Sequence, residues 1–136
     1  MARMPNRGSP SVNLIDSEAE SLTNLALGAA NSMPQVSELL LGEIARAQTH
    51  RVEQIPPDVV TMHSSVEFID EASGIERTVQ IVYPAQADIG AGQISILTPI
   101  AAGLIGLREG QSISWPDREG RKRRLTIVKV TQPTRI

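Results

Sequence analysis

The chain has 136 residues, a formal net charge of −2, 40% apolar residues and 21% charged residues, which suits one domain with a real core or one small domain with an appendage. It has no cysteine, which excludes a disulfide scaffold, a thiolate nucleophile and a cysteine-ligated zinc site. Aromatic residues make up only 2%, so the core must be aliphatic, and a base-stacking platform for single-stranded nucleic acid is disfavoured.

No membrane-spanning or export segment is predicted. The longest apolar stretches fall far short of the ~18 residues that a membrane span needs, and no apolar run follows the two arginines near the N-terminus. We therefore expect a cytoplasmic protein without a membrane partner. Residues 1–12 are dominated by Pro, Arg, Asn, Gly and Ser, a composition that predicts disorder.

Two short helices are predicted between residues 13 and 54. Ser17 and Glu20 fit a capping box for the first helix, and Asp16 is the other N-cap candidate. Ser32 is the expected cap of the second helix, with Pro34 in its first turn. Each helix carries one narrow apolar stripe at helical spacing: Leu22, Leu25, Ala26 and Ala29 in the first, and Val36, Leu39, Leu40, Ile44 and Ala47, interrupted by Glu43, in the second.

Two such helices joined by a tight turn make a short antiparallel hairpin. The hairpin either supplies two core helices to an α+β domain or protrudes from it, and the narrow stripes slightly favour protrusion. A boundary follows at Pro56–Pro57, because a proline pair cannot continue a helix. Six of the eight charged residues from 15 to 54 are acidic, whereas six of the seven from 118 to 129 are basic. We therefore expect two units, 13–54 and 55–136.

The second unit has a strand-like pattern. Alternating residues predict strands over 65–70, 77–83, 93–97, 112–115 and 122–131. Thr98 as N-cap and Pro99 at the first helical position predict one short helix, which Gly106 ends. In the last strand the apolar face switches after Ile127, so either both faces are covered or a bulge intervenes. The predicted fold class is α+β, with an antiparallel β domain that carries one short helix.

No catalytic or metal site is predicted. His50, at the expected end of the second helix, and His63 lack both a nucleophile motif and metal-ligand spacing, so we interpret both as structural. No glycine pattern fits a phosphate-binding loop. One basic run is interpreted mainly as a solvated hairpin tip, with an acidic protein surface or nucleic acid as the alternative partner. Its members are Arg121, Lys122, Arg123 and Arg124.

The residues from Gln93 to Ile113 combine a strand with an Ile–Ser pair, a Thr–Pro helix start, a short helix that ends at Gly, and a second Gly three residues before Ile. This order resembles the C-terminal domain of the bacterial Gre-type transcript-cleavage factors. Segments 57–62, 65–66 and 82–85 are similar to a small branch of the same superfamily, the regulators of nucleoside diphosphate kinase. The resemblance covers roughly residues 12 to 131. One departure is Gln111, where the family usually carries Asp, and we expect only a local effect.

The resemblance implies an FKBP-like C-terminal domain behind a helical coiled coil. In Gre factors this domain docks on RNA polymerase, and acidic residues at the tip of a long coil hold a magnesium ion that drives cleavage of backtracked RNA. Here the tip would be Asn31–Gln35, which has no carboxylate, and Glu38 is the nearest one. We therefore expect a non-catalytic regulator that does not stimulate cleavage, with no cofactor and no small-molecule substrate.

RNA polymerase is thus the expected protein partner, and nucleic acid would be contacted only within that complex. Two alternatives remain open: an FKBP-like prolyl isomerase, which three aromatic residues can hardly equip with an apolar pocket, and control of nucleoside diphosphate kinase by direct contact or through gene expression. The candidate polymerase contacts lie around the short helix: Ile96, Thr98, Pro99, Leu104, Arg108 and Trp115.

Overall fold

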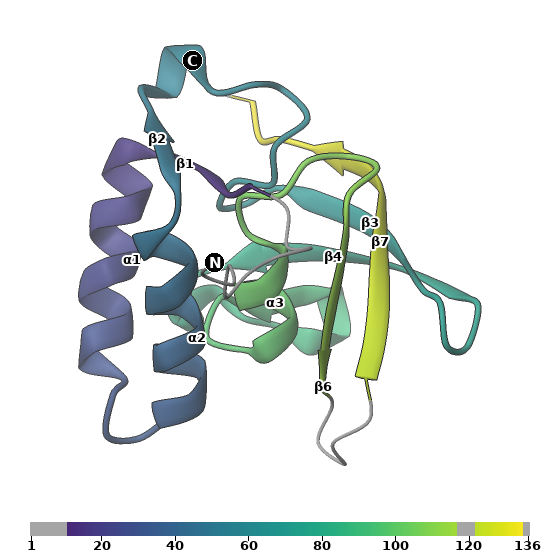
Figure 1. Ribbon diagram of the computed structural model, residues 1–136, viewed down its shortest axis with the longest axis horizontal. Coiled ribbons are helices and arrows are strands. Elements are labelled where there is room, and N and C mark those ends of the chain that lie inside the picture. Colours follow the sequence, from purple (N-terminus) through teal and green to yellow (C-terminus); the bar gives the residue numbers. More distant parts are fainter. Residues whose placement is uncertain (1–10, 117–121, 135–136) are drawn as a thin grey trace, which may run out of the picture.

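The computed structural model describes residues 11–116 and 122–134 (Figure 1). It is an α+β fold in which two helices lie beside a five-stranded sheet that also carries a short third helix. Three single 3₁₀ turns occur at Val52–Gln54, Pro84–Gln86 and Ile89–Ala91. The helices and strands follow in the order β1 (Asn13–Ile15), α1 (Asp16–Gly28), α2 (Pro34–Ala45), β2 (Gln48–His50), β3 (Ser65–Asp70), β4 (Ile75–Val82), β5 (Gln93–Ser95), α3 (Pro99–Leu104), β6 (Ser112–Pro116) and β7 (Lys122–Thr131).

The large sheet has the strand order β5-β4-β3-β7-β6. All neighbours are antiparallel except β4 and β5, which run parallel. The register between β3 and β7 shifts between Glu67 and Phe68. This shift is a β-bulge, one of the two explanations offered above for the change of apolar face in the last strand. Because of this shift, Val128 is exposed while Ile127 and Val130 both remain buried.

The predicted short helix is present as α3. The Thr98 side chain accepts a hydrogen bond from the backbone N–H of Ala101 at 3.4 Å, and Pro99 occupies the first helical position. Gly106 follows with φ of +84°, a conformation that glycine adopts without steric cost. The sequence signals at both ends of this helix are therefore confirmed.

The capping prediction for the first two helices is wrong. Strand β1 leads directly into α1, so the N-cap residue is Ile15 and the helix begins at Asp16. Ser17 therefore lies inside the helix and is not the N-cap residue of a capping box. Helix α2 has Met33 as its N-cap, with no side-chain cap, although Pro34 does lie in its first turn. His50 lies in β2, because the second helix already ends at Ala45.

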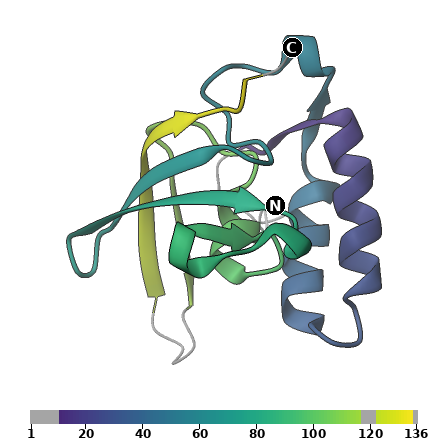
Figure 2. The ribbon, with the colours of Figure 1, turned by 180° about the vertical axis from the view of Figure 1, so that it is seen from behind.

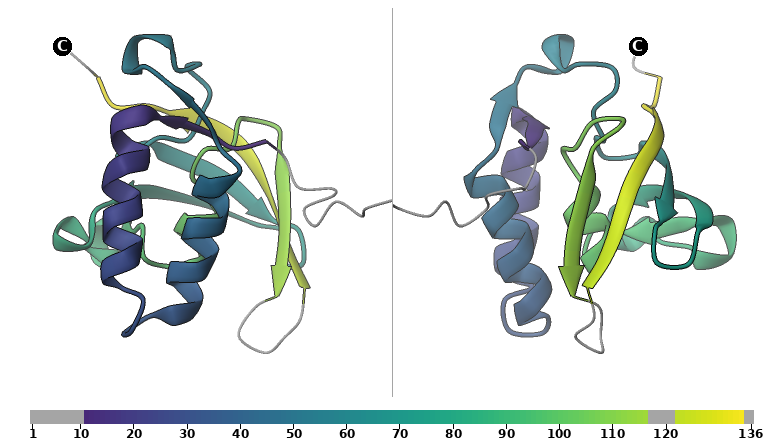
Figure 3. Two further views of the ribbon diagram at one scale, coloured as in Figure 1. Left: turned by 60° about the vertical axis from the view of Figure 1, so that its left-hand side comes forward. Right: turned by 45° about the vertical axis from the view of Figure 1, so that its right-hand side comes forward.

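The helix pair α1–α2 lies along one side of the sheet (Figures 2 and 3) and shares one apolar core with it. Leu14, Leu22 and Leu40 belong to the same buried cluster as Phe68 of β3 and Leu104 of α3. The expected boundary at Pro56–Pro57 thus separates segments of the chain, whereas side-chain packing crosses it. The helices are core helices along one side of the fold, which was the less favoured of the two predicted arrangements.

The disorder expected over residues 1–12 does not extend to Val12. Residues 1–10 lie outside the described part of the chain, but Val12 is fully buried, and its carbonyl accepts a hydrogen bond from the Gln48 N–H at 2.8 Å. Val12 belongs to the main buried cluster, and its Cγ1 lies beside Gly106.

Among the helices of residues 11–116 and 122–134, none has both the length and the apolar character that crossing a membrane requires.

Candidate functional site

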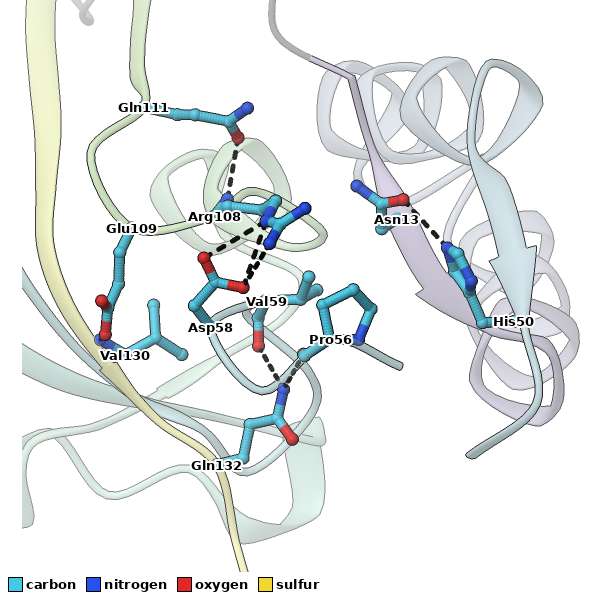
Figure 4. Close-up of polar contacts among 10 residues, drawn as sticks. All are labelled: Asn13, His50, Pro56, Asp58, Val59, Arg108, Glu109, Gln111, Val130 and Gln132. Carbon is cyan, nitrogen blue, oxygen red and sulfur yellow. Dashed lines mark hydrogen bonds and ion pairs between the residues drawn. The ribbon is translucent and has the colours of Figure 1, made fainter. Parts of the chain in front are cut away.

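Two segments run side by side where α3 ends (Figure 4). Val59 forms an antiparallel bridge with Arg108. The N–H of Val60 donates to the carbonyl of Leu107 at 2.8 Å, and the N–H of Gly106 donates to the carbonyl of Val60, also at 2.8 Å. The segments 56–60 and 106–109 are therefore held together by backbone hydrogen bonds, although the sequence showed a strand at neither place.

Arg108 and Asp58 form an ion pair across these segments (Figure 4). The Arg108 Nη2 lies 3.0 Å from Asp58 Oδ1, and its Nε donates to both carboxylate oxygens at 3.1 and 3.2 Å. The Arg108 side chain is still 45% exposed. The carboxylate therefore orients the guanidinium without burying it, and the remaining N–H groups can reach a partner.

Gln111, the one departure noted in the resemblance above, lies in the turn before β6. Its Oε1 accepts a hydrogen bond from the Arg108 backbone N–H at 2.8 Å. The side-chain amide oxygen thus satisfies a turn donor, as a carboxylate would. The hydrogen bond lies within one turn, and the expectation that the departure has only a local effect stays a prediction.

Two further side chains fix the end of β7 to this region (Figure 4). Glu109 Oε2 accepts from the Val130 N–H at 2.8 Å. Gln132 Nε2 donates to the carbonyls of Pro56 and Val59, each at 2.8 Å. These contacts join segments 56–60, 106–111 and 130–132 into one rigid surface, which we call the junction surface.

The predicted contact residues divide into two groups. Ile96 and Leu104 are fully buried, so they are core side chains and not surface contacts. Thr98 is half-buried as the helix cap, whereas Pro99 and Arg108 are exposed. Trp115 lies in β6, and its side chain is outside the described part of the structure.

The basic run is described only in part. Arg121 lies outside the described residues, and the side chains of Lys122 and Arg123 are likewise not described. Arg124 is exposed, and its Nε lies 3.5 Å from Glu71 Oε1. Glu71 therefore neutralises part of the charge of Arg124, and the interpretation of the whole run as a solvated hairpin tip stays a prediction.

Three members of the junction surface were not predicted from the sequence: Asp58, Glu109 and Gln132. Asp58 lies within a segment that carries the family resemblance, but its partner Arg108 is fifty positions away in the chain. Exposed polar residues have no periodic pattern that would reveal such a pairing. The backbone pairing of segments 56–60 and 106–109, which includes the bridge between Val59 and Arg108, brings the two side chains together.

Within residues 11–116 and 122–134, the titratable side chains form no recognisable catalytic arrangement. His50 Nε2 lies 2.9 Å from Asn13 Oδ1, and His63 Nε2 lies 2.9 Å from Gln86 Oε1, so each ring is paired with an amide. Burial raises the pKa of Tyr83, and a hydrogen bond from Ser21 opposes this effect. In the described ranges, no three His, Cys, Asp or Glu side chains could together hold a metal ion.

The far end of the helix pair is also free of carboxylates. Residues 31–35, which join α1 to α2 and begin α2, are exposed and uncharged. Helix α1 has 13 residues and α2 has 12, which at 1.5 Å per residue gives about 20 Å. The helix pair is therefore short, and its end lacks the acidic side chains that a divalent cation prefers.

Comparison with known proteins places these features in a family. Residues 55–132 match the C-terminal region of the transcription elongation factors GreA and GreB. The chain is 37% identical over 106 residues to the regulator of nucleoside diphosphate kinase of Escherichia coli K12, with 78% of each chain covered. It is 34% identical over 111 residues to the transcription elongation factor GreA of Azorhizobium caulinodans, covering 79% of this chain and 70% of that one.

A solved structure agrees with these matches. The GreA/GreB transcription elongation factor from Nitrosomonas europaea superposes with a TM-score of 0.72 at 39% identity, covering 91% of this chain and all of that one. The family match spans more than half of the chain, and the likeness includes both the helix pair and the sheet. The chain therefore belongs to the GreA/GreB family of transcription elongation factors.

Proposed function

We propose that this protein binds RNA polymerase and regulates transcription without stimulating transcript cleavage. Family membership supports polymerase as the partner, because the relatives are transcription elongation factors. The absence of cleavage stimulation is proposed because the end of the helix pair, residues 31–35, is uncharged. Metal-assisted cleavage needs carboxylates that share a hard cation at that place, and this end supplies none.

The junction surface and the start of α3 are the proposed contact region. Pro99 is exposed at the first turn of α3, and Arg108 offers unpaired N–H groups beside Asp58. Both side chains are carried on backbone that is fixed by hydrogen bonds, so little conformational entropy is lost when a partner binds. This rigidity suits a protein that acts by docking.

Binding to purified RNA polymerase core enzyme at low salt tests the first half. We expect a complex at micromolar concentrations and about a threefold loss of affinity for Arg108→Ala, since it removes one exposed charged contact. Arg77→Ala is the matched control, because Arg77 is exposed on β4. Absence of binding by the unmodified protein refutes the proposed partner, and equal losses in the two variants refute the role of Arg108.

A cleavage assay on backtracked polymerase complexes tests the second half. We expect no increase in transcript cleavage over polymerase alone, whereas a Gre factor with an acidic tip serves as the positive control. Stimulation by this chain at saturating concentration contradicts the proposal, because it would require a cation site that residues 31–35 cannot form.

The link to nucleoside diphosphate kinase is proposed to run through transcription. One relative is named for regulation of that kinase, and a polymerase-binding protein can change the amount of the kinase transcript without touching the enzyme. We expect a deletion strain to show altered kinase transcript levels, while added protein leaves the activity of the purified kinase unchanged. A direct effect on the purified enzyme would refute this route.

A further inference from the structure

Asn31 and Ser32 form the middle of the turn between α1 and α2. The Met33 N–H donates to the Ala29 carbonyl at 2.7 Å, and this bond closes the turn around them. Both side chains are exposed, and Figure 1 shows the turn at the end of the helix pair remote from β1 and β2. Asparagine is a chemically labile residue, so an asparagine at such a place raises the question of covalent change.

The reaction of interest joins the side chain of Asn31 to the backbone of Ser32. The Ser32 backbone nitrogen attacks Cγ of Asn31 and forms a C–N bond, while the bond from Cγ to the side-chain nitrogen breaks. Ammonia leaves and takes up the proton of the Ser32 N–H, which gives a cyclic imide. Water then opens the ring at either carbonyl, so that aspartate or isoaspartate results. Water is the co-reactant, and no atom is oxidised or reduced.

The Ser32 backbone nitrogen is available for this attack. Within the part of the chain that the structure describes, its N–H donates no hydrogen bond to backbone or side chain. A backbone N–H that is paired must first break its hydrogen bond before it can lose its proton. The serine side chain is also small and unbranched at Cβ, so it hinders the approach of the nitrogen to Cγ of Asn31 very little.

The other asparagines are less suited to the reaction. Asn24 is exposed as well, but it lies inside α1, and the N–H of the following Leu25 belongs to the hydrogen-bond ladder of the helix. Asn13 is only 8% exposed and lies in β1, which pairs with β2. Asn6 lies outside the described residues. Of the three asparagines within the described ranges, Asn31 therefore combines exposure with a free backbone nitrogen behind it.

We propose that Asn31 is a site of spontaneous deamidation, which turns the uncharged α1–α2 turn into a negatively charged one. The chain has no charged residue from 21 to 37, so the product carboxylate is the first charge in this stretch. It lies two residues before Met33, the N-cap of α2, whose first turn has no acidic residue. A negative charge near a helix N-terminus is favourable, so the fold tolerates the aspartate form.

This inference is independent of the proposed function. One carboxylate does not complete a site for a divalent cation, which takes several oxygen ligands. The expected lack of cleavage stimulation is therefore the same before and after the reaction. The modification changes the charge of the turn and, in the isoaspartate form, adds a methylene group to its backbone.

Incubation of the complete chain at alkaline pH tests the proposal, with ion-exchange chromatography and peptide mapping by mass spectrometry as readouts. We expect an acidic form that elutes with the Asn31→Asp variant and carries the mass gain of an amide converted to an acid at residue 31. Modification should be at least about tenfold faster at Asn31 than at Asn24, because the reaction at Asn24 requires α1 to open first. The proposal is overturned if most of the new acid maps to Asn6, Asn13 or Asn24.

Two variants connect the acidic form to the attack by residue 32. Ser32→Val keeps Asn31 but places a β-branched side chain next to the attacking nitrogen, so we expect the reaction to be slower by about tenfold. Asn24→Gln is the matched control, because Asn24 is also exposed, and it should leave the rate unchanged. Unchanged melting temperatures show that both variants are folded. Equal rates in Ser32→Val and the unmodified protein contradict the proposed attack.

The same measurement on the chain unfolded in guanidinium chloride tests what the structure contributes. Folding should slow the modification of Asn31 by less than about threefold, whereas it should slow that of Asn24 and Asn13 by more than about tenfold, because helix or strand pairing holds the backbone only at the latter two. Strong protection of Asn31 in the folded chain would mean that the turn is too rigid for ring closure, and this result would also overturn the proposal.

Discussion

Gly106 lies at the closest approach between the N-terminal strand and the end of α3. A Cβ placed on it would lie 2.4 Å from Cγ1 of Val12 and 3.0 Å from the carbonyl oxygen of Asn13. Its own carbonyl accepts the Asn13 N–H at 2.8 Å. This residue therefore has two reasons to be glycine, its positive φ and the lack of space, and only the first is local.

Gly106→Ala is expected to lower the free energy of unfolding by about 3 kcal/mol, since a left-handed conformation and a steric clash both add to the cost. Gly74→Ala is the control, because Gly74 has φ of +76° and nothing within 4 Å of its added Cβ, and it should cost only about 1 kcal/mol. Urea denaturation measures both values. Equal costs would show that the N-terminal strand moves aside freely.

Glu43 is the polar residue that interrupts the apolar stripe of α2. Burial raises the pKa of this carboxyl above its usual value of 4.5, and Arg46, whose Nη2 lies 2.7 Å from Glu43 Oε1, opposes the shift only in part. The folded protein therefore binds this proton more tightly than the unfolded chain does. The protonated Glu43 carboxyl therefore contributes to the free energy of unfolding below pH 4.5, and this contribution is lost as the pH rises through the pKa of the folded state.

Glu43→Gln cannot ionise, so it should avoid this loss. We expect the variant to be more stable, relative to the unmodified protein, at pH 7 than at pH 4, as measured by the difference between their free energies of unfolding. Urea titrations at the two pH values measure the difference. Glu38→Gln, on the exposed side of the same helix, is the control. A relative stability that falls between pH 4 and pH 7 would mean that the ion pair with Arg46 outweighs burial.

At the scale of elements, α1 and α2 are joined by a buried hydrogen bond as well as by apolar packing. Ser37 Oγ donates to the carbonyl of Ala26 at 2.7 Å, and Ser37 is almost completely buried. The hydroxyl provides a second donor to a helix carbonyl near the end of α1. This bond fixes how far one helix is displaced along the other.

Ser37→Ala is expected to destabilise the protein by about 1 kcal/mol, the usual net contribution of such a hydrogen bond. Ser32→Ala, at an exposed position of the turn between α1 and α2, should change the stability by less than about 0.5 kcal/mol. Thermal or urea unfolding compares the two variants. A neutral Ser37→Ala substitution would show that apolar packing alone sets the helix pairing.

Elements whose signals are local were predicted well. Thr98, Pro99 and Gly106 define α3 because capping and chain reversal depend on neighbouring residues. The start of α1 was mispredicted, since backbone pairing of β1 with β2, not a side-chain cap, precedes it. Short pairings such as this one, or Val59 with Arg108, leave no periodic pattern in the sequence.

At the scale of the whole molecule, the helix pair and the sheet form one packing unit. The buried cluster contains Leu14, Leu22 and Leu40 together with Val66 and Leu107. Removing either part would expose the apolar surface of the other. Cooperative unfolding is therefore expected for the complete chain.

We expect helical circular dichroism and the fluorescence of Trp115, which reports on β6, to give the same unfolding midpoint in urea. A fragment of residues 55–136 should fail to unfold cooperatively, because it loses the covering side chains of the helix pair. Two separate transitions in the complete chain, or a stable cooperative fragment, would show that the units fold independently.

The α+β class, the order of the three helices and of the five strands of the large sheet, the aliphatic core and the absence of carboxylates at residues 31–35 all follow from the amino-acid sequence, because periodicity, capping residues and composition are properties of nearby residues. It also carried the resemblance to the Gre family. Only the tertiary structure decided that the helix pair is part of the core, that Ile96 and Leu104 are buried, and that Asp58 meets Arg108. These outcomes depend on contacts between distant segments, and such contacts are set by how all the elements pack together.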